Sequence, residues 1–284
     1  MEFRQKNVQC ISPSGLHRMA YTEWGDPANT HVLLCVHGLT RNGRDFDTLA
    51  RTLSQHYRVV CPDIVGRGKS SRLRQPAGYG IPQYVADIVT LIARLGVESV
   101  DWVGTSMGGL IGMTLASQDG TPIRRMVLND VGPVITAESL RRLATYVGTD
   151  PLFPDFASAL AYIRIICAPF GALDEDQWLR LAEHTVAQRA DGQWGFVYDP
   201  KIAEPFKAAF VEHDIDLWPV YEAIRCPVLA IRGGDSDLLT RDVWQAMGMR
   251  GPQARLAEIP GVGHAPMFQT REQIDVVRDF LLAA

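Results

Sequence analysis

The sequence has no run of hydrophobic residues long enough to cross a lipid bilayer, which takes roughly 18 or more apolar residues. Its N-terminal segment, MEFRQKNVQCISPSG, also lacks the apolar stretch of a secretory signal. These two absences predict a cytoplasmic protein with no membrane partner.

Cysteine is scarce, and its pattern does not suggest disulfides or a metal site. The number is odd, and no two cysteines form a C-x-x-C pair. The five are Cys10, Cys35, Cys61, Cys167 and Cys226. Three of them lie in or beside apolar runs, as expected for cysteine used as a small hydrophobic residue in a reducing compartment. No cluster has the spacing of metal ligands, so we expect neither a metal nor another cofactor.

The chain also lacks an excess of positive charge. Lys and Arg number 28 against 32 Asp and Glu, for a net charge of -4 over 284 residues. A nucleic-acid-binding surface usually has a basic excess, so nucleic acid is not expected as a main partner. The densest basic segment contains Arg67, Lys69, Arg72 and Arg74, and we interpret it as a solvated loop. The oligomeric state is not predicted.

What the sequence does have is a regular alternation of short apolar runs and helical patterns. Such runs are typical of strands buried on both faces, and the alternation predicts a parallel sheet with helices on both sides. An antiparallel pair is expected ahead of it, within residues 7–23. The predicted strands are 31–36, 57–61, 99–103, 124–129, 227–232 and 254–259, and the predicted helices are 45–55, 82–95, 107–118, 241–249 and 271–282.

The alternation is interrupted between about Pro133 and Ala223, where the pattern indicates helices and loops rich in aromatic residues. We therefore expect an α/β core formed by residues 1–133 and 223–284, with an insertion at 134–222. Open α/β sheets bind ligands beyond the carboxyl ends of their strands, and the insertion is expected to cover that edge.

The segment Gly104-Thr105-Ser106-Met107-Gly108 fits the pattern G-x-S-x-G between a predicted strand and a predicted helix. This is the context of a nucleophile elbow, in which a sharp turn exposes the serine hydroxyl above the sheet. Side chains two residues to either side would collide, which explains the glycines. Ser106 is thus the predicted nucleophile.

A serine nucleophile needs a base, and His264 in Gly263-His264-Ala265-Pro266 follows a predicted strand in the expected chain order. An acid should orient this histidine through its other ring nitrogen. We predict Asp237 for that role. Asp235 is interpreted as a turn residue and Asp130 as a structural residue before the insertion, although Asp130 could also reach the histidine.

Two backbone N–H groups are expected to stabilise the oxyanion that forms when the serine attacks a carbonyl. One is that of Met107, directly after the nucleophile. The other is that of Leu39, in the loop that follows the strand at 31–36. His37, two residues earlier, is expected to brace this loop.

Together these motifs resemble the α/β-hydrolase superfamily, in its capped branch with a serine nucleophile. The matching segments are HGLT at 37–40, DIVGRGKS at 63–70, GTSMGG at 104–109, RGGDSD at 232–237 and GHAP at 263–266. The resemblance implies an eight-stranded, mostly parallel sheet with a helical lid after strand six. Serine at the elbow argues against the epoxide hydrolases and haloalkane dehalogenases of this fold, which carry aspartate there. The general similarity is to small bacterial esterases and lactonases.

The resulting hypothesis is a serine hydrolase that cleaves an ester or lactone of a small, largely apolar substrate through an acyl-enzyme. The same triad could instead serve an acyltransferase, a perhydrolase or a C–C bond hydrolase, and the same fold could serve a ligand receptor. Arg41, Arg44 and Arg164 are candidates to meet a substrate carboxylate, with solvated arginines as the simpler interpretation.

Overall fold

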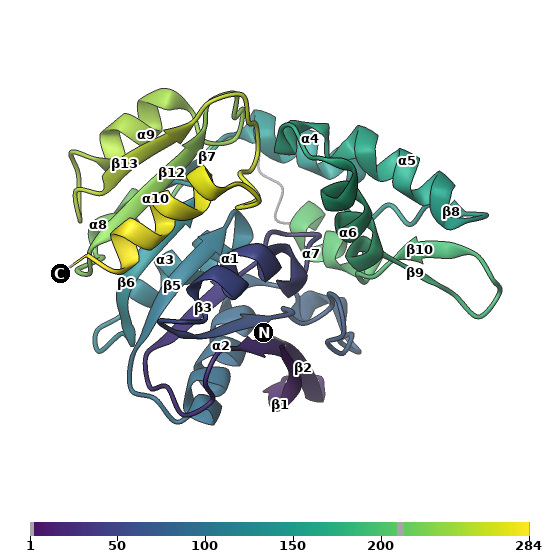
Figure 1. Ribbon diagram of the computed structural model, residues 1–284, viewed down its shortest axis with the longest axis horizontal. Helices are drawn as coiled ribbons and strands as arrows, with labels where there is room; N and C mark the ends of the chain where they lie inside the picture. Colours follow the sequence, from purple (N-terminus) through teal and green to yellow (C-terminus); the bar gives the residue numbers. More distant parts are fainter. Residues whose placement is uncertain (1–2, 209–212, 284) are drawn as a thin grey trace.

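An eight-stranded sheet forms the centre of the computed structural model, which describes residues 3–208 and 213–283 (Figure 1). Its strand order is β1-β2-β4-β3-β5-β6-β12-β13. The first two strands and the β2–β4 pair are antiparallel, and the remaining neighbours are parallel. The strands are β1 (Arg4–Ser12), β2 (Gly15–Trp24), β3 (Val32–Val36), β4 (Arg58–Pro62), β5 (Val100–Thr105), β6 (Ile123–Asn129), β12 (Val228–Gly233) and β13 (Arg255–Ile259). The predicted mostly parallel eight-stranded sheet is confirmed.

Helices cover both faces of this sheet because successive strand residues point to opposite sides. In β3, Leu33 and Cys35 join one buried cluster, which includes residues of α1 and α10, whereas Leu34 joins the cluster on the other face, with α2 and α3. These helices are α1 (Asp47–Leu53), α2 (Ile81–Leu95), α3 (Met107–Ala116) and α10 (Arg271–Leu281); α9 (Arg241–Met247) follows β12. Short 3₁₀ helices lie at η1 (Gly43–Phe46), η2 (Pro76–Gly78), η3 (Ala168–Phe170) and η4 (Pro200–Ile202).

Glycine brings α3 close to the sheet. A Cβ at Gly112 would lie 2.4 Å from the indole nitrogen of Trp102 on β5. The same indole nitrogen donates a hydrogen bond to the Gly108 carbonyl, at 3.2 Å. The small-residue helix predicted after the elbow is therefore packed directly on the strand that precedes it.

The described part of the chain between β6 and β12 adds no strand to the large sheet and projects beyond the core (Figure 1). Its first and last strands, β7 and β11, pair with each other, so the two ends of this segment lie together at its base. Its elements are β7 (Val134–Ile135), α4 (Ala137–Tyr146), β8 (Leu152–Phe153), α5 (Phe156–Ile166), α6 (Glu175–Thr185), β9 (Val186–Gln188), β10 (Trp194–Phe196), α7 (Ala203–Ala208), β11 (Ile215–Asp216) and α8 (Trp218–Glu222). The small β8-β10-β9 sheet is an addition to the predicted helices and loops.

Across residues 3–208 and 213–283, no helix combines the length and the apolar character that a membrane crossing requires. All five cysteines are free thiols; Cys226 is half-buried and the other four are buried. Cys35 and Cys61 lie in the interiors of β3 and β4, where they pack as small hydrophobic residues.

Candidate active site

Ser106 occupies the sharp turn between β5 and α3. Its backbone has φ 51° and ψ -115°, a conformation that residues other than glycine rarely adopt. The flanking glycines make this turn possible. A Cβ at Gly104 would lie 2.4 Å from the Gly108 carbonyl oxygen, and one at Gly108 would lie 2.0 Å from that of Val36. The turn is closed by the Gly109 N–H, which donates to the Ser106 carbonyl at 2.8 Å. The backbone thus holds the serine at the start of a helix, beside the carboxyl ends of β3 and β5.

His264 reaches Ser106 from the loop after β13. Its Nε2 lies 3.0 Å from the Ser106 Oγ, and its Nδ1 lies 2.7 Å from an oxygen of Asp130. The loop is fixed by the Gly263 N–H, which donates to the Pro169 carbonyl at 2.7 Å. One hydrogen-bonded chain therefore joins a hydroxyl, an imidazole and a carboxylate, and the serine–histidine contact predicted from the motifs is present.

The carboxylate that bonds to His264 belongs to Asp130. The prediction that Asp237 bonds to His264 is therefore wrong. Asp130 directly follows β6, which lies between β5 and β12, and its side chain is fully buried. One carboxylate oxygen accepts the Gly233 N–H at 2.8 Å, and the other accepts the Ser236 hydroxyl at 2.6 Å. The last residue of β12 and the loop after it thus supply hydrogen-bond donors to the acid, whereas the acid itself comes from the end of β6.

Asp237 lies farther along that same loop and pairs with a side chain of α4. Its side chain is 58% exposed and forms an ion pair with Arg142 of α4, at 2.8 Å. Asp235 is also exposed, and its backbone N–H donates a hydrogen bond to the Val262 carbonyl. Neither replaces Asp130. The signal for Asp130 in the sequence was its place directly after the strand that neighbours the nucleophile strand.

The loop expected to hold the oxyanion packs against the nucleophile. A Cβ at Gly38 would lie 3.7 Å from that of Ser106. His37 braces this loop, as expected: its Nδ1 donates to the Gly38 carbonyl at 2.7 Å and its Nε2 accepts the Ile64 N–H at 2.9 Å. Complete burial lowers the pKa of His37 to about 3, so this histidine is neutral at physiological pH and cannot act as a cation.

Arg67 corrects the interpretation of the basic segment as a solvated loop. Its side chain is buried, and its guanidinium donates to the Leu39 carbonyl at 2.9 Å and to the Tyr84 hydroxyl at 2.8 Å. It also contacts the sulfur of Met107 at 3.6 Å. No carboxylate pairs with it in the described part of the chain. Lys69, Arg72 and Arg74 are exposed, as expected.

The turn that carries Arg67 is held by the buried Asp63. Its carboxylate accepts the N–H groups of Gly43 and Lys69, both at 2.8 Å, and Gly68 has a positive φ of 54°. Burial raises the pKa of Asp63, and these N–H donors oppose that shift. The segment DIVGRGKS therefore acts as a rigid support behind the nucleophile and the Leu39 loop.

Ser106 and His264 open into a cavity of about 620 Å³ between the core and the insertion. Its volume is in the range of small-molecule sites, and its wall is largely apolar. Leu39 and Met107 line it as well, so all four motif-derived groups border the same space. The aromatic residues that the insertion contributes to the wall are Tyr146, Tyr162, Phe170, Phe196 and Tyr198.

Among the three arginines considered for a substrate carboxylate, only Arg41 lines this cavity in the described residues. Arg44 forms an ion pair with Asp47, and Arg164 forms one with Glu175. Neither arginine is among the residues that line the cavity. Arg142 of α4, which the sequence did not single out, lines the cavity wall together with Leu143 and Tyr146.

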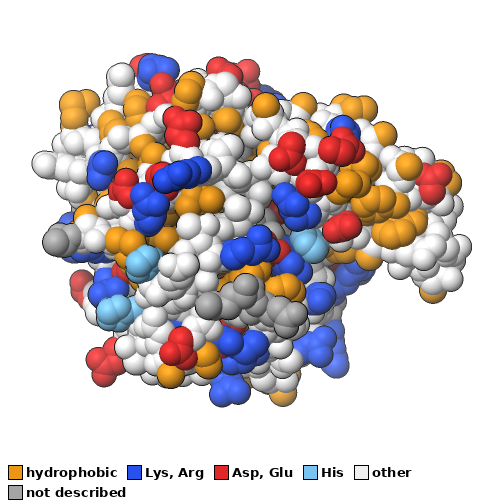
Figure 2. All heavy atoms as spheres, in the orientation of Figure 1, with side chains coloured by type: hydrophobic (Ala, Val, Ile, Leu, Met, Phe, Trp, Pro, Cys, Tyr) orange, Lys and Arg blue, Asp and Glu red, His pale blue; other side chains and the backbone are white. Residues whose placement is uncertain are grey.

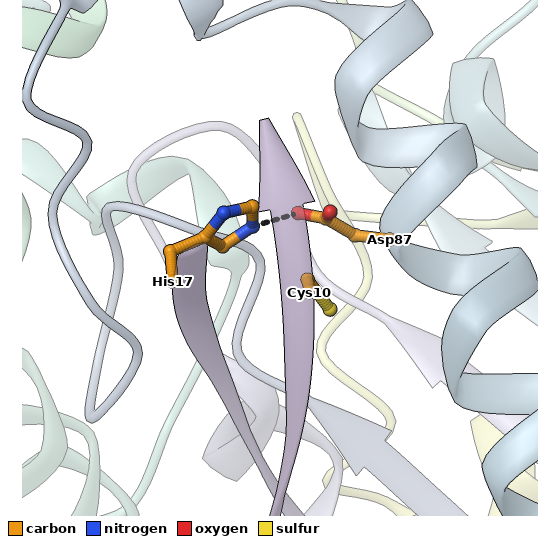
Figure 3. A group of neighbouring side chains, drawn as sticks. All are labelled: Cys10, His17 and Asp87. Carbon is orange, nitrogen blue, oxygen red and sulfur yellow. Dashed lines mark hydrogen bonds and ion pairs between the residues drawn. The ribbon is translucent and has the colours of Figure 1, made fainter. Parts of the chain in front are cut away.

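Figure 3 shows a second cluster of titratable side chains, Cys10, His17 and Asp87, at the junction of β1, β2 and α2. His17 Nε2 lies 2.8 Å from Asp87, which also accepts the Gln83 amide at 2.8 Å. Burial, with the nearby Asp87, raises the pKa of Cys10 to about 12, whereas a metal ligand must be a thiolate. The Nδ1 of His17 has no partner among the described residues, although metal-bound histidines usually donate from that nitrogen. These contacts fit a buried link between the first hairpin and α2.

Comparison with known proteins gives one consistent result. Residues 31–270 match the family model described as alpha/beta hydrolase fold. The chain is 51% identical to the 3-hydroxybutyrate-oligomer hydrolase of Cupriavidus necator over 98% of this chain and 97% of that protein. It is 27% identical to the 2-(acetamidomethylene)succinate hydrolase of Mesorhizobium japonicum over 82% and 81% of the two chains. Among solved structures, an alpha/beta hydrolase from Novosphingobium aromaticivorans superposes with a TM-score of 0.87 at 35% identity, covering 99% and 98% of the two chains.

Proposed function

Because this chain belongs to the α/β-hydrolase family, we propose that it hydrolyses the ester bonds of short 3-hydroxybutyrate oligomers through an acyl-enzyme on Ser106. The chain is a hydrolase of this fold; its substrate and its reacting groups are what we propose. The substrate class rests on the extensive similarity to the enzyme of that name from Cupriavidus necator. A largely apolar cavity next to a nucleophile suits such uncharged ester linkages.

In the first half of the reaction, the Ser106 hydroxyl attacks the ester carbonyl and passes its proton to His264, which lies 3.0 Å away. Asp130 accepts the other imidazole N–H, fixes the tautomer and stabilises the charged ring. The carbonyl oxygen becomes an oxyanion, to which the Leu39 and Met107 N–H groups donate. When the tetrahedral intermediate collapses, the ester C–O bond breaks and His264 protonates the departing alcohol.

In the second half, water replaces the alcohol. His264 removes a proton from the water, whose oxygen attacks the acyl-enzyme carbonyl, and the same N–H groups hold the second oxyanion. The bond between the acyl carbon and Ser106 Oγ then breaks, and His264 returns the proton to the serine. The products are a free acid and an alcohol, and the enzyme regains its starting state with no cofactor consumed.

The observation that carries this proposal is the continuous hydrogen-bonded chain from Ser106 through His264 to the buried Asp130, at the wall of an apolar cavity. Gly38, directly before Leu39, packs on the same serine. This order of hydroxyl, base and acid is the arrangement that nucleophilic acyl transfer requires, and it favours a hydrolase over a ligand receptor.

Incubation with the dimer and trimer of 3-hydroxybutyrate, followed by quantification of the released monomer, tests the substrate. We expect monomer to accumulate until the oligomers are consumed. Hydrolysis of p-nitrophenyl butyrate by the same preparation shows whether the catalytic site is working. Activity on the p-nitrophenyl ester without release of 3-hydroxybutyrate would show that the substrate class is wrong while the reaction type is right.

A further inference from the structure

Helix α4 places two polar side chains, Arg142 and Tyr146, one helical turn apart on the cavity wall. Leu143, between them in sequence, lines the same wall. Burial raises the pKa of Tyr146, with Arg142 and Asp237 among the charges that act on it, so these groups are neighbours. Tyr146 is 37% exposed. A cation and a phenol hydroxyl therefore border a space that is otherwise largely apolar.

The ion pair that holds Arg142 is exposed to solvent. Its side chain is 40% exposed, and that of Asp237, its partner at 2.8 Å, is 58% exposed. Ion pairs of this kind are weak because water screens them. Asp237 itself does not line the cavity, whereas Arg142 does. An anion inside the cavity can therefore accept hydrogen bonds from Arg142, because the ion pair with Asp237 that it would replace is weak.

Arg41 is the other lysine or arginine that lines the cavity in the described residues, and it is poorly suited to this role. Its guanidinium binds both oxygens of Asp45, at 2.6 and 2.9 Å, and donates a further hydrogen bond to Thr185 at 2.7 Å. This pair is largely buried, so breaking it is costly. Asp45 also lines the cavity, and it would repel an incoming carboxylate.

We propose that Arg142, with Tyr146 beside it, binds the terminal carboxylate of the substrate and so forms the leaving-group subsite; this rests on the proposed function. In an oligomer of a 3-hydroxy acid, the free carboxylate always lies on the alcohol side of the bond that is cleaved. The fragment that departs after attack by Ser106 is consequently the anionic one. Arg142 sets the direction in which the substrate enters, and Asp237 occupies the guanidinium when no substrate is bound.

Three substrates with the same butyryl group test this inference, because they differ only in the leaving group. They are 3-butyryloxybutyrate, its methyl ester and p-nitrophenyl butyrate. For Arg142→Met we expect kcat/KM for the free acid to fall about 10- to 100-fold, chiefly through a higher KM, with both neutral esters within about 3-fold of wild type. Arg142→Lys should recover part of the loss, because it keeps the charge without the planar fork.

Arg141→Met is the matched control, since Arg141 precedes Arg142 on the same helix, is exposed and does not line the cavity. It should leave all three substrates unchanged. Tyr146→Phe should lower kcat/KM for the acid by about 3- to 10-fold and spare the neutral esters.

Equal effects of Arg142→Met on charged and neutral esters would overturn the inference, because they would mean that Arg142 only holds the wall in place. An unchanged kcat/KM for the acid would overturn it as well. Failure of the proposed function is a separate result: the wild-type protein would then cleave p-nitrophenyl butyrate but neither ester of 3-hydroxybutyrate. In that case, inhibition of p-nitrophenyl butyrate hydrolysis by 3-hydroxybutyrate still tests the anion site, and Arg142→Met should raise the inhibition constant about 10-fold.

Discussion

Asp130 is the residue at which the motif pattern and the three-dimensional arrangement differ most. Its carboxylate is fully buried and accepts three hydrogen bonds, from the Gly233 N–H, the Ser236 hydroxyl and the His264 imidazole. These donors fix the position of the carboxylate beside the His264 ring. The carboxylate can therefore orient His264 and stabilise the imidazolium that forms when Ser106 attacks.

Replacing Asp130 with asparagine should lower kcat for p-nitrophenyl butyrate by about 10³- to 10⁴-fold, because an amide N–H directed at Nδ1 favours the wrong tautomer of His264. Asp237→Asn should keep kcat within about 3-fold, since Asp237 pairs with Arg142 at the surface. Steady-state kinetics on both variants, with thermal unfolding to show that each is folded, checks this. The opposite ranking of the two variants would show that Asp237 is the acid after all.

At the scale of elements, the DIVGRGKS turn is connected to the Leu39 loop and to the start of α3 at Met107. Arg67 connects them, because its guanidinium donates to the Leu39 carbonyl and contacts the Met107 sulfur. Leu39 and Met107 are the two residues whose N–H groups we propose as oxyanion donors. Arg67 is accordingly a positioning residue, which acts on the reacting atoms through the backbone that it holds.

Arg67→Met should lower kcat for p-nitrophenyl butyrate by about 10- to 100-fold and leave KM within a few-fold, because oxyanion donors act mainly in the transition state. Arg67→Lys should rescue little, since one ammonium group cannot reach the same spread of acceptors. Arg74→Met, in the exposed part of the same segment, is the control. Steady-state kinetics, measured well below the unfolding temperature of each variant, tests this prediction. A folded Arg67→Met protein with wild-type kcat would refute the positioning role.

The elements of the core could be predicted because strands buried on both faces leave continuous apolar runs, as in VLLCV of β3. The elbow could be predicted because its glycines satisfy a steric demand that few other turns make. The β8-β10-β9 sheet could not, since strands of two or three residues are too short to show a period. Arg67 and Asp130 were misjudged because burial and partners depend on which loops meet in space, and the linear pattern does not contain that information.

At the scale of the whole molecule, the core supplies the proposed reacting groups of the cavity, and the segment between β6 and β12 supplies much of its wall. Ser106, His264 and Asp130 come from loops at the carboxyl ends of the parallel strands. Arg142 and most of the aromatic wall come from the segment that projects beyond them (Figure 1). In the space-filling view, the projecting segment presents hydrophobic side chains and a few charged ones (Figure 2). We expect core substitutions to change turnover of every ester, and substitutions in α4 to change which ester is preferred.

The central claim, that Ser106 is the nucleophile of an ester hydrolase, is tested most directly by hydrolysis of p-nitrophenyl esters from acetate to laurate with wild type and Ser106→Ala. Ser117→Ala, at the other end of α3 and away from the cavity wall, is the matched control. Loss of the Ser106 hydroxyl should reduce turnover by about 10⁶-fold, to the background rate, while Ser117→Ala keeps wild-type activity. A Ser106→Ala protein that hydrolyses these esters as fast as wild type would contradict the account.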